Sequence, residues 1–356
     1  MRAYTLVSLC LALLLFACCG WMGSPESTAA RGPVAAQDRQ LDLEQYRTEK
    51  DAGQVSFSRD VQPILEGRCV VCHGCYDAPC QLKLESGVGI DRGAHKLPVY
   101  NSRLRPTAPT RLNIDAQTAA GWRTKGFHPV LNEQPGSTPQ ANIDNSVLAQ
   151  MLLLKQAHAL PAEGILGRDF EFGLTRRLQC PARDEFDRFA QRRPLWGMPY
   201  GLPGLKPGEH DTVLAWIKQG ARYPEPPPLP PETLADVARY EALLNGSSLK
   251  ERLAARYIYE HLFAGHLHFK GHPDREFFRL VRSRTPSGQP VDEIATVKPF
   301  DDPGPNRFYY RLRPIYESIV DKNHMVYELG PDREKRWKEL FFEPDYPVTA
   351  WPGYDP

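Results

Sequence analysis

The stretch Cys69-Val-Val-Cys72-His73 constrains this chain more than any other part of its sequence. It has the spacing C-x-x-C-H, which is the attachment site of a c-type haem. Two thiols three positions apart can reach the two vinyl groups of one porphyrin, and the next residue carries an imidazole that can ligate the iron. We therefore expect one covalent haem c, with Cys69, Cys72 and His73 as its binding residues and His73 as a metal ligand. A redox dithiol and one half of a zinc site are the alternatives.

The N-terminus predicts export from the cytoplasm. Residues 6–17 are nearly all apolar, which is too short for a membrane span and fits the hydrophobic region of a secretory signal. We expect residues 1–23 to be a signal peptide and residues 24–54, rich in Ser, Ala, Gly, Gln and charge, to be a flexible tether. The expected location is therefore the periplasm.

Two ways of processing this signal stay open. Residues 15–18 resemble a bacterial lipoprotein cleavage box, in which Cys18 becomes the lipidated first residue and anchors the protein to the membrane. Ordinary cleavage after Ala30 or Ala36 is the alternative.

Composition limits the class of protein. A length of 356 residues allows two domains, and a formal net charge of +1 gives no indication of nucleic-acid binding. The 34 prolines and 27 glycines predict much irregular structure. No second apolar run is long enough to cross a membrane.

The remaining cysteines predict a disulfide, because an exported protein folds in an oxidising compartment. Cys75 and Cys80 are close in sequence, and the intervening residues can turn, so we expect a Cys75–Cys80 bond with Cys180 free. A cubane iron–sulfur cluster on Cys69, Cys72, Cys75 and Cys80 is an alternative, although the last gap is one residue too long for the bacterial ferredoxin spacing.

A second signal lies at residues 196–223. A Met198-Pro pair in a loop precedes a helix with Val213, Trp216 and Ile217 on one face and Gly220 at its end. This arrangement resembles the last third of a class I cytochrome c, in which the methionine is the sixth iron ligand. We expect Met198 to be that ligand.

The competing candidates for the sixth ligand are Met151, His128 and His158. An ordinary loop methionine before an amphipathic helix is the simpler interpretation of the same pattern. The long interval after His73 requires residues 83–190 to be an insertion within a haem domain that spans residues 55–223. Ser58 is expected to cap the helix that leads into the haem motif, and Asn145 or Ser146 to cap a helix over residues 147–160.

A Pro-rich linker at residues 224–231 marks the domain boundary. Residues 232–356 predict an α+β domain, with a helix over 233–245 that carries Leu234, Val237 and Leu244 on one face, and a capping box of Ser248 and Glu251 before the next helix. Strands are expected at 277–282 and 309–312, and a short helix at 333–342. His261, His266 and His268 are either ordinary hydrogen-bonded histidines or, for the alternating pair 266 and 268, a metal pair.

Five stretches together resemble the bacterial fatty acid cis/trans isomerases; they are residues 56–65, 72–84, 109–116, 121–130 and 256–269. The resemblance implies a periplasmic haem protein that converts cis double bonds of unsaturated fatty acids or phospholipid acyl chains to trans at the membrane surface. It implies no nucleotide and no nucleic acid. Members of that family are longer, so we expect this chain to be an N-terminal portion and its second domain to be incomplete.

The sequence thus predicts a mainly α chain, with a class I cytochrome c-like helical haem domain, a long irregular insertion, and then the α+β domain. The expected activity is redox-neutral, haem-iron-dependent isomerisation. A membrane-tethered c-type cytochrome for electron transfer is the alternative.

Overall fold

The computed structural model describes residues 54–99, 110–116, 118–160, 166–168, 170–173, 177–223, 228–273, 276–304, 307–320 and 324–354. Residues 33–356 belong to one compact unit of the chain. The predicted signal peptide, nearly all of the tether, Cys18 and half of the Pro-rich linker lie outside the described residues. No helix in the described part is both long and apolar enough to cross a membrane.

The first described elements are the π-helical segment η3 (Phe57–Val61) and the helix α2 (Gln62–Arg68). Ser56 caps this segment, because its hydroxyl accepts a hydrogen bond from the Arg59 N–H at 3.2 Å. The prediction that Ser58 is the cap was wrong by two residues. Proline near the start of α2 is tolerated because the first N–H groups of a helix have no partner in the helix.

Helix α9 (Pro207–Lys218) packs against this segment. The ring of Phe57 lies 5.4 Å from that of Trp216, and Arg68 pairs with Glu209 at 2.9 Å. The predicted apolar face is confirmed, since Trp216 and its neighbours on that face are almost fully buried. The helix is followed by Gly220 at φ +89°, a conformation that favours glycine.

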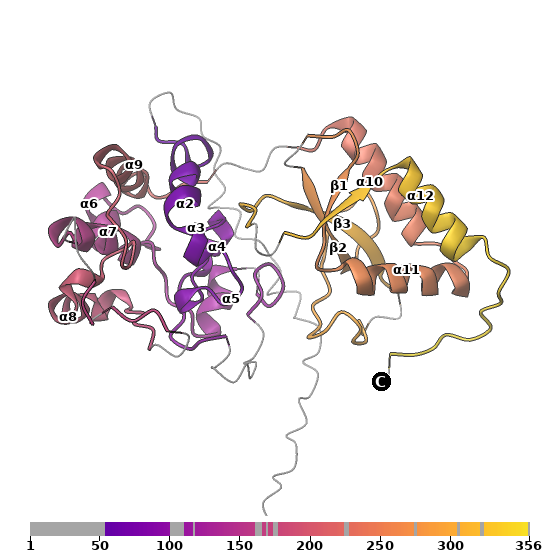
Figure 1. Cartoon of the computed structure of the whole chain (residues 1–356), viewed down its shortest axis with the longest axis horizontal. Helices are drawn as coiled ribbons and strands as arrows, with labels where there is room; N and C mark the ends of the chain where they lie inside the picture. The colour runs from indigo at the N-terminus through magenta and orange to yellow at the C-terminus, as the bar shows by residue number, and fades with distance from the viewer. Residues whose placement is uncertain are drawn as a thin grey trace, which may run out of the picture. The chain divides into compact units, whose positions relative to one another are not determined.

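The long interval between α2 and α9 is built from short helices joined by irregular chain (Figure 1). Ser146 caps the longest of them, as predicted, by accepting from the Ala149 N–H at 3.1 Å. In chain order the elements are α3 (Val70–His73), η4 (Pro79–Gln81), α4 (Gly87–Arg92), α5 (Ala119–Thr124), α6 (Pro139–Asp144), α7 (Val147–Ala157), η5 (Arg183–Glu185), α8 (Phe186–Arg192) and η6 (Pro194–Trp196).

The C-terminal part is a mixed sheet with helices packed on it. Its strands follow the order β3-β2-β1-β4. β1 is parallel to β4 and antiparallel to β2, and β2 is antiparallel to β3. The bounds are β1 (His266–Phe269), β2 (Phe277–Ser283), β3 (Tyr309–Ile315) and β4 (Val326–Leu329).

Three helices and a π-helical segment pack with this sheet (Figure 1). They are α10 (Pro231–Leu244), α11 (Leu249–Leu262), α12 (Pro331–Trp337) and the π-helical η8 (Lys338–Phe342). Phe278 and Leu280 of β2 bury against Ile258 of α11 and other apolar side chains of these helices. The predicted capping box at the start of α11 is present. Leu234, expected on the same face as Val237 and Leu244, is exposed on α10, whereas those two residues are buried.

The predicted fold class is wrong. Helix of all kinds covers 42% of the described residues, a four-stranded mixed sheet organises the C-terminal part, and the chain is not mainly α. The class I cytochrome c-like architecture is likewise not what the structure supports. The C-x-x-C-H and Met-Pro patterns are local, whereas an architecture depends on pairings between distant segments that no local pattern encodes.

Candidate functional site

The C-x-x-C-H motif forms a single helical turn after α2. Cys69 lies at the break between α2 and α3, and its carbonyl accepts hydrogen bonds from the N–H groups of Cys72 at 3.1 Å and His73 at 2.9 Å. Positions separated by three and four residues lie on the same side of a helix. The turn therefore presents both thiols and the imidazole to one side.

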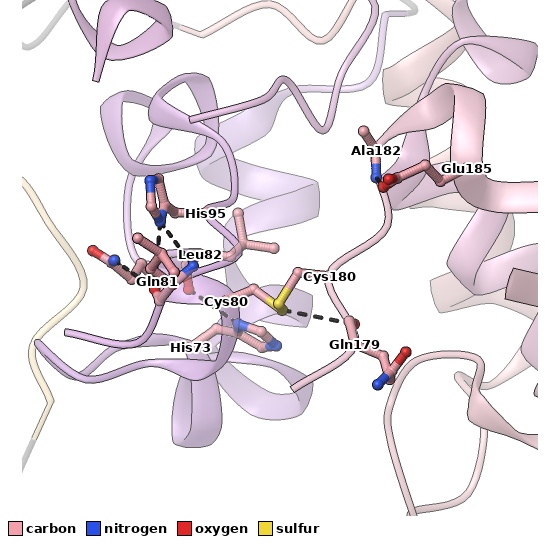
Figure 2. The surroundings of a disulfide bond; sticks show 10 residues. His73, Cys80, Gln81, Leu82, His95, Gln179, Cys180, Ala182 and Glu185 are labelled. Carbon is pink, nitrogen blue, oxygen red and sulfur yellow. Dashed lines mark hydrogen bonds between the residues drawn. A yellow bond between two sulfur atoms is a disulfide. The ribbon is translucent and has the colours of Figure 1, made fainter. Parts of the chain in front are cut away.

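The imidazole of His73 is oriented by the backbone. The ring is buried, with 8% exposure, and its Nδ1 lies 3.0 Å from the carbonyl oxygen of Leu82 (Figure 2). A carbonyl oxygen can only accept, so Nδ1 carries the hydrogen and Nε2 holds a free lone pair. Burial lowers the pKa of His73, which keeps the ring neutral. A neutral imidazole held this way is the state that ligates a metal.

The two thiols of the motif differ in exposure. Cys69 is half-buried and Cys72 is exposed, and neither forms a disulfide. Burial, with a smaller contribution from Cys72, raises the pKa of the Cys69 thiol to about 12. Both side chains are therefore free for a covalent attachment.

The predicted Cys75–Cys80 disulfide is wrong. Cys80 bonds to Cys180 (Figure 2), with 5.6 Å between their Cα atoms. Cys75 is free. Closeness in sequence was the basis of the prediction. In the structure Cys80 has φ 56°, and its side chain meets the segment at Gln179–Pro181 instead of turning back on Cys75. The bond fastens the loop after His73 to a segment 100 residues further along the chain.

A buried arginine holds the same loop from the other side. The guanidinium of Arg92 donates to the carbonyl oxygens of Gln81 and of Thr110, the latter at 2.7 Å. It also lies over the rings of Trp122 and Phe127, at 5.4 and 5.0 Å from their centroids. The stretch at residues 121–130 thus supports the loop that carries Leu82. Sequence reasoning missed Arg92, because nothing local marks a buried arginine.

Met198 lies at the edge of the core of the helical part. Its side chain is half-buried and packs against the same apolar cluster as Cys69. Its N–H donates to the carbonyl of Met151 at 3.1 Å. Gly197 leaves no room for a side chain, since a Cβ there would lie 2.3 Å from the backbone nitrogen of Lys155. The loop is thus held closely against α7.

The other candidate ligands occupy different surroundings. Met151 is buried in the core, with 6% exposure, and His158 is exposed at the end of α7. His128 pairs with Ala94 through the backbone, and burial lowers its pKa.

The histidines of the C-terminal part are not gathered into a metal site. His261 is exposed and bonds to the Tyr257 carbonyl, whereas His266 is buried and its Nδ1 lies 2.5 Å from Nδ1 of His324. His268 does not join this pair. The described part of the chain holds no group of three or more His, Cys, Asp or Glu side chains placed to bind a metal ion.

A cavity of about 390 Å³ lies against one face of the sheet. Its walls come from the loops at residues 76–85 and 111–114, from strands β1 to β3, and from residues 293–299 and 317–320. It touches the segment after the haem motif, because Tyr76 and Val320 line it, and a Cβ on Gly74 would lie 2.7 Å from a Val320 methyl. Sequence reasoning did not find this cavity.

A family model for fatty acid cis/trans isomerases matches residues 107–356. The chain belongs to the fatty acid cis/trans isomerase family. The match begins after the C-x-x-C-H motif and includes most of the cavity wall. No curated protein and no solved structure matches the chain. Isomerisation of fatty acids is the activity that membership of this family implies.

Proposed function

We propose that this protein converts cis double bonds of unsaturated fatty acids to trans with a covalent haem c and without net redox change. Membership of the isomerase family is the observation that supports this reaction. The proposal of a haem is supported by the C-x-x-C-H motif and by the geometry of its histidine, both of which lie outside the matched region.

The residues of the motif fit a haem c. Cys69 and Cys72 are free thiols one helical turn apart, and His73 offers Nε2 while Nδ1 is committed to the Leu82 carbonyl. Hydrogen bonding of the second ring nitrogen is the usual way in which proteins fix a metal-ligating histidine. Cys69, Cys72 and His73 would hold the group. Met198, which borders the same apolar cluster as Cys69, is the proposed sixth ligand.

Haem iron would supply an electron-withdrawing centre that weakens a π bond, so that rotation about the former double bond becomes possible. The protein supplies binding and orientation and excludes water. Apolar side chains of the cavity wall, among them Ile294 and Val320, suit an acyl chain. The neutral state of His73, favoured by burial, keeps its lone pair available.

We place the reaction in the periplasm, at the membrane surface. The apolar N-terminal stretch supports export, and the tether that follows would keep the protein close to its substrate. A single lipid chain would give only marginal attachment, so surface contacts would have to add to it.

The test supplies palmitoleate to the purified ferric holoprotein with no electron donor and follows the trans product by gas chromatography. We expect trans product without uptake of solvent deuterium at the double bond. The variants Cys69→Ala and Cys72→Ala should lose covalent haem and activity together, while Cys75→Ala keeps both. A need for a sustained electron supply would contradict the proposal and favour an electron-transfer cytochrome.

A further inference from the structure

A row of nitrogen-bearing side chains crosses the face of the sheet that borders the cavity. Arg279 of β2 and Arg313 of β3 are direct cross-strand partners. On the other side of Arg279, its Nη2 lies 3.3 Å from Nε2 of His266 on β1. All three side chains line the cavity. Like charges placed directly opposite each other destabilise a sheet, so this row needs negative charge nearby.

Arg279 and Arg313 differ in how much negative charge lies close to them. Nε of Arg313 lies 3.2 Å from Glu293, and its Nη1 lies 4.0 Å from Glu317. Arg279 makes no ion pair with any carboxylate of the described residues. Its hydrogen bond is to His266, and Glu317, Glu293 and Glu85 act on it only over a longer range. Burial and the neighbouring Arg313 lower the pKa of Arg279, yet a guanidinium stays protonated in proteins.

His266 cannot compensate this charge. Burial, with Arg279 and His324 adding to it, lowers the pKa of His266 to about 4, so the ring is neutral near pH 7. Its Nε2 accepts from Arg279, and its Nδ1 faces His324. The guanidinium has five N–H donors in a planar fork, which leaves donors for an anion in the cavity.

The remaining cations of the cavity wall already have partners. Lys83 pairs with Glu85, and Arg111 pairs with Asp115 at 3.0 Å. Among the cations of the described cavity wall, Arg279 is therefore the one without a carboxylate partner. A half-buried cation with no carboxylate in contact is unfavourable, and an anionic ligand in the cavity would reduce that cost.

The same cavity also has an apolar wall that reaches solvent. Leu280 and Ile294 are buried, whereas Phe263 and Val297 are 40% and 52% exposed. A cavity with one unpaired cation and an apolar exit suits an amphiphile: a small anionic head bound inside and a hydrocarbon chain along the wall.

We propose that this cavity binds the carboxylate of a fatty acid, with Arg279 as the group that pairs with it. The inference rests on the proposed function for the identity of the ligand and deepens it by naming the residue that recognises the head group. A planar carboxylate matches the guanidinium fork, and the alcohol of the same chain length does not.

Calorimetric titration of the purified full-length holoprotein with laurate and with dodecanol tests the inference, because laurate has no double bond to isomerise. We expect laurate to bind more tightly than dodecanol. Arg279→Gln should weaken laurate binding at least tenfold and leave dodecanol binding within twofold, while Arg279→Lys retains part of the affinity. The exposed Arg188→Gln is the matched control, with no change.

Equal weakening of both ligands in Arg279→Gln, or no weakening, would overturn the inference. Inorganic phosphate binding as tightly as laurate would also overturn it, since a simple anion site would then suffice. Should Arg279→Gln fail to fold, the wild-type protein still decides the matter. The ¹³C resonance of carboxyl-labelled laurate should titrate at a lower pH when bound than when free, and a higher titration pH would contradict pairing with a cation.

The result separates the inference from the proposed function. Laurate binding that depends on Arg279 in a protein without isomerase activity would keep the site and reject the function. Isomerisation of palmitoleate with an unchanged KM in Arg279→Gln would keep the function and reject the site.

Discussion

At the scale of single residues, burial decides what each histidine can do. His73 and His266 are both buried, and in each case burial is the main cause of a lowered pKa. Their hydrogen bonds then separate their roles. His73 commits Nδ1 to a carbonyl and keeps Nε2 free, whereas both nitrogens of His266 are engaged by other side chains. Ligation is therefore open to the first ring and closed to the second.

A residue-scale prediction concerns Met198. If its sulfur ligates the iron, the ferric holoprotein should show the near-infrared thioether–iron band, and Met198→Ala should lose this band and lower the reduction potential. Met151→Leu is the control, because a volume-conserving change in the core should leave the spectrum intact. A thioether band that persists in Met198→Ala would assign the sixth position to Met151, and a wild-type spectrum without this band would assign it to His128 or His158.

A second residue-scale prediction concerns pH. The folded pKa of His266 is about 4, below the ordinary histidine value of 6.5, so the unfolded chain binds the proton more tightly. This contribution to stability is complete above pH 6.5 and is lost as the pH falls towards 4, by about 3 kcal/mol. Below pH 4 both states are protonated, and the loss stops growing.

Urea unfolding at several pH values measures this contribution. Between pH 7 and pH 4, His266→Gln should lose less free energy of unfolding than the wild type, while the exposed His261→Gln should follow the wild type. Arg279, His324 and Glu317 surround the ring and remain in the variant. Parallel curves for the wild type and His266→Gln would show that His266 does not titrate in this range.

At the scale of elements, the short helices between α2 and α9 are positioned by contacts that reach far along the chain. The Cys80–Cys180 disulfide and the hydrogen bonds of Arg92 fasten the loop that carries Leu82. That loop in turn supplies the carbonyl that orients His73. Segments far from the C-x-x-C-H motif in sequence thus help to orient its histidine.

The corresponding prediction concerns the disulfide. It closes a loop of 100 residues, so the paired change Cys80→Ser with Cys180→Ser should lower the free energy of unfolding by about 2–5 kcal/mol. Denaturant unfolding under non-reducing conditions measures the loss. Cys75→Ser should leave stability unchanged, because Cys75 is free. An equal loss in both variants would argue for a bond that includes Cys75.

At the scale of the whole molecule, Ser318 connects segments distant in sequence. Its N–H donates to the Glu85 carbonyl at 2.8 Å, and its hydroxyl donates to Glu66 at 2.8 Å and accepts from Gln62 at 3.3 Å. The connection joins α2 to the chain after β3, next to the cavity. The helical part and the sheet part are therefore expected to unfold together.

Ser318→Ala tests this connection. Loss of its hydroxyl bonds should lower the free energy of unfolding by about 1 kcal/mol. The exposed Ser247→Ala serves as the control and should change nothing. Fluorescence and circular dichroism should report one coincident transition in the wild type. Two separate wild-type transitions would mean that the parts are not coupled.

The sequence by itself determined the features that depend on neighbouring residues. The turn of the C-x-x-C-H motif, the capping box at Ser248, the buried face of α9 and the strands β2 and β3 follow from local spacing and hydrophobic period. Five sequence stretches between residues 56 and 269 also resemble the isomerase family, and the family match confirms that membership.

Only the tertiary structure decided what depends on pairing between distant segments. It joined Cys80 to Cys180 instead of Cys75, placed Arg279 opposite Arg313, and combined strands from separate stretches into a mixed sheet where a mainly α chain was expected. The physical reason is the same in each case. Side-chain periodicity reports which face of an element is buried but not which partner covers it, because the partner is chosen by packing and charge over the whole fold.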